Sequence, residues 1–315
     1  IEEVCKNLSI EDIEVRTDSD SDVAQYVQEI EINWVEVKLP AVFDSILGFL
    51  RAFLKDRLGK LRDWGILRRK DSDLKFVSKT ELLGLQAQLR GRATSGGKDF
   101  IAWRGISVLA EVMKMQHALE LLETQGITVL HTYLQKMQKD SLTTTTKAVK
   151  NIVGDVNFRS ALIKTEKLFE ERIQHPKIIE LKKLVKAELQ DSGAKVMVFN
   201  QYRDNAQDIA NELNTLDGVN AVLFVGQTKK GDTGLTQKDQ KKVLEEFREG
   251  KHNVLVATSV GEEGIDIPKV NLVVFFEPIP SAIRTIQRRG RTGRHEKGKV
   301  VVLMALNTRD VGYKW

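Results

Sequence analysis

The chain has 315 residues, of which 41% are hydrophobic and 30% are charged. These values are typical of a globular protein with room for two or three domains, and they exclude a globally disordered chain. The formal net charge of +5 permits a polyanionic partner without requiring one. The single cysteine, Cys5, excludes an internal disulfide framework and favours a reducing, cytoplasmic compartment. No group of Cys and His has metal-ligand spacing, and no apolar run approaches the roughly 20 residues of a membrane span.

The first 39 residues predict connecting structure. They begin with a short helical pattern, continue with an expected strand over 10–17 and the acidic run DSDSD, and end in VQEIEINWVEVKL. That last segment alternates apolar and polar residues with the period of a strand. The chain opens as a helix already under way, without an initiator Met. We therefore expect residues 1–39 to connect this chain to a preceding domain of a longer protein.

Residues 40–174 predict an all-helical domain. Pro40 stands at a favourable first helical position, apolar residues recur at helical spacing from Phe43 to Trp64, and Gly65 is a typical stop. Further helices are expected at 78–91, 99–124, 128–139 and 158–174. Long antiparallel helices with shorter partners make a bundle, here a thumb-like insert.

Residues 175–315 predict an α/β domain. A helix over 177–190 precedes short apolar strands at 195–199, 221–225, 253–257, 271–276 and 299–306. Helices fit 203–215, 236–249 and 281–289, and Thr236 and Asp239 form a capping box before the second of these. Apolar strands separated by helices predict a parallel sheet covered by helices on both faces.

The segment QRRGRTGR at 287–294 is the most informative part of the sequence. It holds four arginines and two glycines in eight residues. Arginine is planar, permanently charged and suited to bidentate phosphate contacts. Glycines between arginines let the backbone turn sharply, so alternate guanidinium groups can converge on one point. The alternative is a basic surface turn that binds nothing.

A second informative segment, ATSVGEEGIDI at 257–267, directly follows a predicted strand. Sheets of this class bind ligands at the carboxyl ends of their strands. Small hydroxyl residues there can bond phosphate oxygens, Gly264 permits close approach, and Asp266 offers a carboxylate to a ribose hydroxyl or an arginine. The alternative is an ordinary loop with capping residues.

These two segments resemble motifs V and VI of superfamily 2 helicases. FNQYR at 199–203 looks like motif IV, and FVGQ at 224–227 looks like the element that follows it, so four motifs stand in family order. Residues 225–240 and 258–294 are most similar to the archaeal Hef and Fanconi anaemia M-type helicases. The resemblance covers about 175–308 and implies a RecA-like lobe. The wider group carries a helical insert between two such lobes, which matches 40–174 by position.

The resemblance also implies residue roles. Arg291 and Arg294 would be catalytic arginine fingers that reach the γ-phosphate of ATP, where such fingers contribute on the order of 10³–10⁵ in rate. Gln287 would position the fingers and the nucleotide, and Gly264 and Asp266 would contact its ribose side. Six residues would hold the nucleic-acid backbone: Gln201, Arg203, Gly226, Gln227, Thr258 and Ser259.

The segment RAFLKDRLGKLRDWGILRRK at 51–70 holds eight basic and two acidic residues. Five of the basic residues lie on one predicted helix with an apolar opposite face, namely Arg51, Lys55, Arg57, Lys60 and Arg62, and the first four are the expected contacts. In a helicase insert such a face would contact duplex or forked DNA through phosphates. The alternative is a solvated helix face. We expect Trp64 and Trp103 to anchor the core rather than to stack on bases.

The chain contains neither a G-x-x-x-x-G-K-[ST] phosphate loop nor a DEAH-like tetrapeptide. In the family both belong to the first RecA-like lobe, so we expect ATP and Mg²⁺ to be held mainly by a lobe that precedes Ile1. The leading hypothesis is the second half of an ATP-dependent helicase on forked or branched DNA, intracellular and nucleoid-associated, inactive without its first lobe. A non-catalytic nucleic-acid-binding module and an RNA-directed motor of the Dicer or RNA-sensor type stay open.

Overall fold

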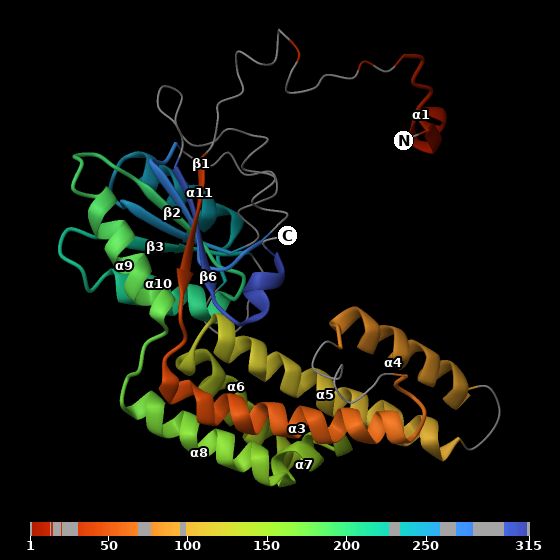
Figure 1. Cartoon of the computed structure of the whole chain (residues 1–315). Helices are drawn as coiled ribbons and strands as arrows, with labels where there is room; N and C mark the ends of the chain where they lie inside the picture. The colour runs from red at the N-terminus through yellow and green to blue at the C-terminus, as the bar shows by residue number, and fades with distance from the viewer. Residues whose placement is uncertain are drawn as a thin grey trace.

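The computed structural model of the protein describes residues 2–12, 14, 20, 31–68, 77–94, 99–226, 234–258, 269–279 and 299–313. After a short helix, α1 (Glu2–Asn7), a helical bundle and a six-stranded sheet lobe lie next to each other (Figure 1). The predicted fold class is confirmed. Of the strand expected over 10–17, residues 10–12 and 14 belong to no strand, and the rest lie outside the described residues.

Within the described residues, six helices build the bundle. They are α3 (Asp44–Asp63), α4 (Lys79–Thr94), α5 (Phe100–Thr124), α6 (Ile127–Thr143), α7 (Lys147–Gly154) and α8 (Val156–Glu170), preceded by a short 3-10 turn, η1 (Ala41–Phe43). The central helix is α5, which contacts α3, α4, α6 and α7. The predicted helices are confirmed to within a few residues, but α7 has no predicted counterpart. None of the described helices is long and apolar enough to cross a membrane.

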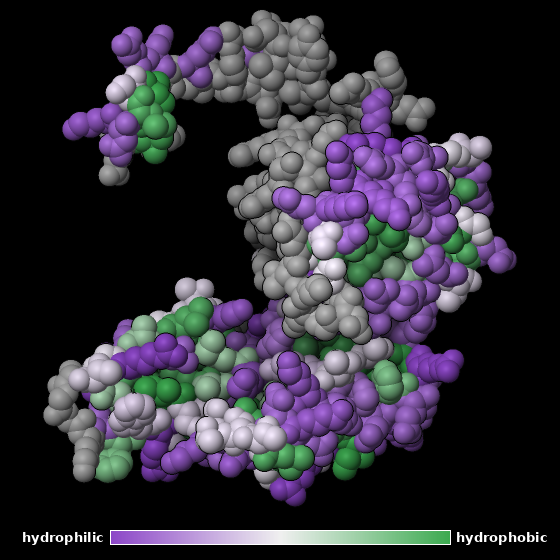
Figure 2. Space-filling model, turned by 180° about the vertical axis from the view of Figure 1, so that it is seen from behind, coloured by the Kyte–Doolittle hydropathy of each residue, from purple (hydrophilic) through white to green (hydrophobic). Residues whose placement is uncertain are grey.

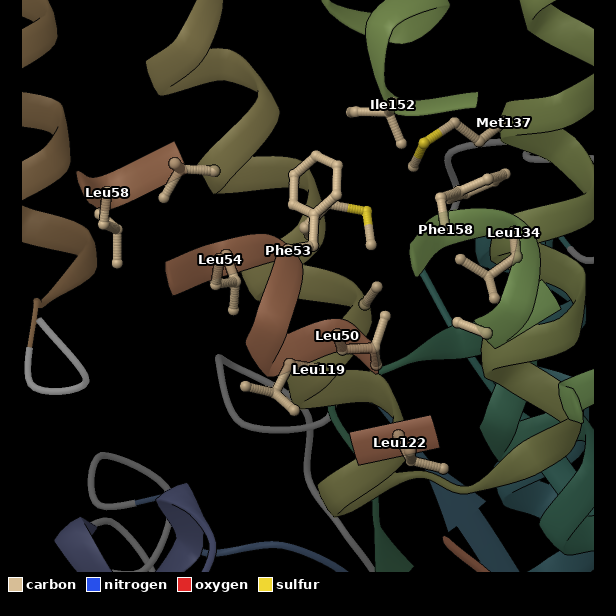
Figure 3. Packing of buried hydrophobic residues seen from close by; sticks show 14 of the residues in the cluster. Leu50, Phe53, Leu54, Leu58, Leu119, Leu122, Leu134, Met137, Ile152 and Phe158 are labelled. Atoms are coloured by element: carbon tan, nitrogen blue, oxygen red, sulfur yellow. The ribbon is translucent and has the colours of Figure 1, made fainter. Parts of the chain in front are cut away.

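One apolar core holds the bundle together. Phe53 of α3 is fully buried, and Figure 3 shows it in the core with side chains from α5, α6, α7 and α8. Burying a side chain of this size contributes about 1.5–3 kcal/mol. A glycine lets α4 approach α5, because a Cβ at Gly105 would lie 2.6 Å from Ile66 Cδ1 and 2.8 Å from Leu89 Cδ1.

The sheet is entirely parallel, with strand order β1-β6-β5-β2-β4-β3. Its strands are β1 (Glu31–Val37), β2 (Val196–Phe199), β3 (Ala221–Phe224), β4 (Val254–Ala257), β5 (Leu272–Phe275) and β6 (Lys299–Ala305). Strands β2 to β6 confirm the five strands predicted after residue 194. The first strand lies in the segment assigned to a connector, yet it pairs with β6 along its whole length. The strand expected in VQEIEINWVEVKL is confirmed as β1, and its partner is one that the local pattern could not identify.

Helices cover both faces of the sheet. Val196 and Val198 of β2 share a core with α9 (Pro176–Glu188) and α10 (Arg203–Leu213), whereas Met197 and Phe199 share one with α11 (Gln237–Arg248). This alternation buries every residue of β2, as the predicted two-sided cover requires. The capping box of α11 is confirmed. The lobe ends in η4 (Arg309–Tyr313), and the helix predicted over 281–289 lies outside the described residues.

Candidate nucleic-acid interface

Four predicted site residues stand at the carboxyl ends of three adjacent strands. Gln201 and Arg203 follow β2, Gly226 follows β3, and Thr258 follows β4, which pairs with both other strands. We call this stretch the carboxyl edge. Because the strands are parallel, residues separated by more than 50 positions in the sequence come together at one edge of the sheet.

Direct contacts hold the carboxyl edge together. The Arg203 guanidinium donates from Nη2 to the Gly226 carbonyl at 3.1 Å, which joins the loops after β2 and β3. Thr258 is buried, and its N–H donates to the Phe224 carbonyl at 3.1 Å. The side chain of Gln201 is exposed, whereas the backbone N–H of Gln201 donates to the Glu277 carboxylate. Arg203 and Thr258 therefore shape the edge, and Gln201 presents an exposed amide on it.

A buried polar cluster connects this edge to the bundle. Gln125, directly after α5, accepts hydrogen bonds at Oε1 from Asn200 Nδ2 at 2.9 Å and from Asn205 Nδ2 at 2.6 Å. Its own amide donates to Glu277, which follows β5, and to the Thr124 hydroxyl at 2.9 Å. We call Gln125, Asn200, Asn205 and Glu277 the Gln125 cluster; each of these four side chains is buried. One amide from the bundle thus fixes both the start of the β2 loop and the first turn of α10.

Burial controls the ionisation of Glu277. It raises the pKa of the carboxyl to about 7, although the nearby Lys177 cation and the N–H donors of Gln125 and Gln201 act in the opposite direction. Lys177 itself is fully buried, paired with Asp310 at 2.5 Å, and lies 5.5 Å from the centre of the Phe276 ring. The end of β5 and the start of α9 therefore share one buried, charged environment.

A close approach between Gly126 and His175 makes this arrangement possible. Gly126, between α5 and α6, has a φ of +106°, and a Cβ there would lie 2.9 Å from the Cβ of His175. The His175 Nδ1 accepts from the Lys177 N–H at 3.2 Å, and its Nε2 donates to the Glu123 carbonyl, also at 3.2 Å. Burial, together with the Lys177 cation, lowers the pKa of His175 to about 3. A neutral imidazole thus links the end of α5 to the start of α9.

A second contact between bundle and edge lies one turn earlier on α5. Glu120 accepts a hydrogen bond from the Tyr202 hydroxyl at 3.0 Å and lies 3.7 Å from the Arg309 guanidinium. Tyr202 belongs to the β2 loop between Gln201 and Arg203. The last turns of α5 thus hold that loop at two places, by Glu120 and by Gln125.

The basic face predicted on α3 divides into exposed and buried parts. Lys55 is exposed, Arg51 pairs with Glu123 at 3.1 Å while 54% of its side chain stays exposed, and Lys60 pairs with Asp56 at 2.8 Å at the surface. These three cations remain accessible to a phosphate.

Arg57 differs, because its guanidinium is buried among carboxylates. It donates to Glu111 at 2.6 Å, to Asp155 at 3.0 Å and to the neighbouring Asp56, and it lies 4.4 Å from the centre of the Phe53 ring. Only 8% of the residue is exposed. The expected phosphate contact of Arg57 therefore needs correction. A sequence pattern gives the face of a helix but not the carboxylates that other helices bring to it.

The expectation for the two tryptophans also needs correction. Trp64 is half-buried and packs against the bundle core, as expected. Trp103 is instead 58% exposed, and Phe100, one turn earlier on α5, is 72% exposed. Figure 2 shows hydrophobic residues at the surface of the bundle among hydrophilic ones. Trp103 is therefore no core anchor.

The remaining predicted site residues lie outside the described residues. They are Gln227, Ser259, Gly264, Asp266, Gln287, Arg291 and Arg294. Their roles stay predictions. Three residues of the Gln125 cluster are absent from the predicted site altogether, namely Gln125, Asn205 and Glu277. Only Glu277 carries a local signal, as an acid directly after a buried strand. The part of the chain that the structure describes holds no cluster of three or more His, Cys, Asp or Glu residues able to bind a metal ion.

Two family models match the chain, and their ranges follow the two parts of the fold. "Helicase conserved C-terminal domain" matches residues 176–296, and "Putative ATP-dependent RNA helicase, helical bundle" matches residues 42–171. With the parallel sheet and the motif residues at its carboxyl edge, these matches define the class. The chain belongs to the superfamily 2 helicases, as a helicase C-terminal domain preceded by a helical insert.

Within this class, the relationship to Hef and Fanconi anaemia M-type helicases is confirmed. The crystal structure of the Pyrococcus furiosus Hef helicase domain is 42% identical, with a TM-score of 0.79 over 100% of this chain and 63% of that one. A "Putative ATP-dependent RNA helicase" of Methanocaldococcus jannaschii is 39% identical over 99% of this chain and 38% of its own length. An "ATP-dependent DNA helicase" of Neurospora crassa is 30% identical over 96% of this chain and 27% of its own length. The chain thus spans well under half the length of these two relatives.

Proposed function

We propose that this chain supplies the second motor lobe and the helical insert of an ATP-dependent DNA helicase that acts on forked or branched DNA. The observation that carries the proposal is the carboxyl edge. There Gln201, Arg203, Gly226 and Thr258 stand on adjacent strand ends in a chain of this family. The exposed side-chain amide that Gln201 presents on this edge suits a sugar–phosphate backbone, which needs positioning contacts rather than base-specific ones.

ATP with Mg²⁺ is the cofactor that this function requires, and we assign its phosphate cradle and magnesium ligands to a first RecA-like lobe in the same motor. Arg291 and Arg294 would contribute the arginine fingers from this chain, with Gln287 positioning them. Gly264 and Asp266 would face the ribose. The described structure supports the location, because β4 and β5 lead into these segments at the carboxyl edge and β6 follows them.

The Gln125 cluster gives this motor a rigid second half. Because Gln125 and Glu120 hold the β2 loop, we expect the insert and the carboxyl edge to move as one body when the two lobes close. A step along the backbone would then also move the basic face of α3, formed by Arg51, Lys55 and Lys60. The insert would hold the duplex while the edge holds the tracked strand.

We favour DNA over RNA as the track because of the Hef and DNA-helicase relatives. The name of the Methanocaldococcus relative supports the RNA alternative. ATP turnover by the motor, measured with forked DNA and with forked RNA of the same sequence, separates the two. Stronger stimulation by RNA would overturn the preference for DNA. Absence of stimulation by either would favour a non-catalytic binding module.

The fingers provide the sharpest test of the motor function. In a protein in which this chain is joined to a first lobe with a phosphate loop, Arg291→Ala or Arg294→Ala should lower ATP turnover by about 10³ or more. DNA affinity without nucleotide should hardly change, because a finger acts only in the closed transition state. Lysine at either position should restore little activity, since it lacks the planar fork.

Arg288→Ala serves as the matched control, with the same residue type in the same segment. It should leave turnover within a few-fold of wild type. Equal losses of turnover for all three alanine variants, together with weaker DNA binding, would contradict the finger assignment. The segment would then be a DNA-contact patch.

The α3 face predicts a salt-dependent contact. Replacing Arg51, Lys55 and Lys60 with Ala should weaken binding of the chain to forked duplex DNA. The slope of log affinity against log salt should fall by about 0.9 for each phosphate contact removed. Fluorescence anisotropy over a salt series measures both. Unchanged affinity and slope would mean that the face is merely solvated.

A further inference from the structure

A large groove of the bundle lies between α3, α5 and α7. Its volume is about 1330 Å³, and each helix lines it with residues three, four or seven positions apart. Along α5 these include Phe100, Trp103, Arg104 and Ser107. Residues at that spacing share one face of a helix. The groove is therefore a continuous surface built by three helices, separate from the carboxyl edge of the sheet.

The charge of the groove is positive. Four exposed cations line it, namely Lys60 of α3, Arg104 of α5, and Lys147 and Lys150 of α7. The two carboxylates in its lining, Glu111 and Asp155, are both paired with the buried guanidinium of Arg57. Counting Arg57, the lining holds five basic side chains against these two carboxylates, so the groove is net positive and its exposed cations are in excess. Such a surface attracts a polyanion.

Aromatic rings lie between these cations. Phe100 and Trp103 are 72% and 58% exposed, although burial would stabilise rings of this size. The Arg104 guanidinium lies 5.0 Å from the centre of the Trp64 ring, which also lines the groove. The hydroxyl oxygen of Ser107 is buried beside it and has no hydrogen-bond partner within the described residues. Exposed rings between cations are typical of sites where unpaired bases stack and phosphates pair.

We infer that this groove binds unpaired nucleotides of single-stranded DNA, with bases stacked on Trp103 and Phe100 and phosphates on Lys147 and Lys150. The inference rests on the proposed nucleic-acid function and deepens it, because the insert would hold a displaced strand as well as the duplex. Duplex DNA fits this groove less well, since its base faces are covered by stacking and only its phosphates could reach the cations.

The test compares two oligonucleotides of equal length, an oligothymidylate and the same backbone with abasic sites. The chain should bind the oligothymidylate roughly 5- to 150-fold more tightly, the range that stacking of one base on an aromatic ring provides. Tryptophan emission should be quenched on binding. Trp103→Ala should abolish most of the preference for bases and the quenching, whereas Trp103→Phe should keep the preference because it keeps a ring.

Two further variants complete the design. Replacing Lys147 and Lys150 with Ala should weaken binding of both oligonucleotides and lower the salt slope by about 0.7 per contact. Ile163→Ala is the matched control, because Ile163 is a 65% exposed apolar residue of α8 outside the groove lining. It should leave both affinities unchanged. Thermal unfolding of each variant verifies the fold. Because Trp103 is highly exposed, Trp103→Ala should change the unfolding temperature little.

Equal binding of the two oligonucleotides by wild type, or an unchanged preference in Trp103→Ala, would overturn the inference. Tighter binding of an acidic peptide such as polyglutamate than of the oligothymidylate would also overturn it and indicate a protein-binding groove. These results leave the motor proposal standing, because that proposal is judged by ATP turnover and the finger variants. Conversely, a motor without turnover on any nucleic acid would remove the proposed function itself.

Discussion

Replacing Gln125 with Leu should destabilise the protein far more than an ordinary glutamine substitution. Leucine has nearly the same size but neither accepts nor donates a hydrogen bond, so the amide groups of Asn200 and Asn205 would lose the acceptor that both use. Both asparagines are buried, at 0% and 3% exposure. Each of these two buried donors left unpaired costs about 1–3 kcal/mol, so the expected loss of unfolding free energy is about 2–6 kcal/mol.

Urea unfolding, followed by circular dichroism and extrapolated linearly to water, measures this loss. The matched control is Gln135→Leu on α6, where the amide makes a single 3.4 Å hydrogen bond to Glu166 at the surface. That variant should stay within about 0.5 kcal/mol of wild type. If Gln125→Leu is no more destabilising than this control, the amide hydrogen bonds contribute nothing to the junction and the reasoning fails.

Two further predictions concern buried charge. The pKa of Glu277 in the folded protein, about 7, exceeds the ordinary value of 4.5 for a glutamate, so between these two values the folded state holds a proton that the unfolded state has released. Stability contributed by this group therefore falls as pH rises through that window, and Glu277→Gln should gain on wild type by at most about 3 kcal/mol between pH 5 and 8. The contribution of His175 to stability changes with pH in the opposite direction, but it is the same in wild type and in Glu277→Gln. Denaturation curves of the two proteins at each pH measure the difference in unfolding free energy, and a difference that stays constant across pH would contradict the prediction. Arg57→Ala should cost about 3–5 kcal/mol of unfolding free energy, because Glu111 would be left charged and buried. Arg51→Ala, which breaks a half-exposed pair, should cost under about 1 kcal/mol, and equal losses would refute the buried-network argument.

Local periodicity was sufficient to predict most of the fold. Helical spacing from Phe43 to Trp64 predicted α3, and five short apolar runs between residues 195 and 306 predicted β2 to β6. These elements follow from local patterns, because the period of apolar residues decides which structure can bury one face or two. The order of the motif residues predicted the helicase class, and three of the four motif segments begin at the carboxyl ends of β2, β3 and β4.

Only the tertiary structure decided which partners these elements have. The alternating pattern of β1 predicted a strand, but its pairing with β6 comes from the far end of the chain. The same limit applies to Arg57 and Trp103. The pattern of each helix does not distinguish either residue from its neighbours, and only the packing shows which is buried and which is exposed. Arg57 is buried because α5 and α7–α8 bring Glu111 and Asp155 to it, and Trp103 is exposed because α7 leaves an open groove beside it.

The Gln125 cluster shows the same limit at the functional site. Gln125 follows a helix, Asn200 lies within the motif IV segment, Asn205 lies two residues after it, and Glu277 follows a strand, so each residue looks locally ordinary. Their hydrogen bonds join positions 75, 80 and 152 residues apart. A sequence pattern predicts the local structure and burial of a residue, because these depend on its near neighbours in the chain. The acceptor that satisfies a buried amide is supplied by packing, and therefore only the folded chain identifies it.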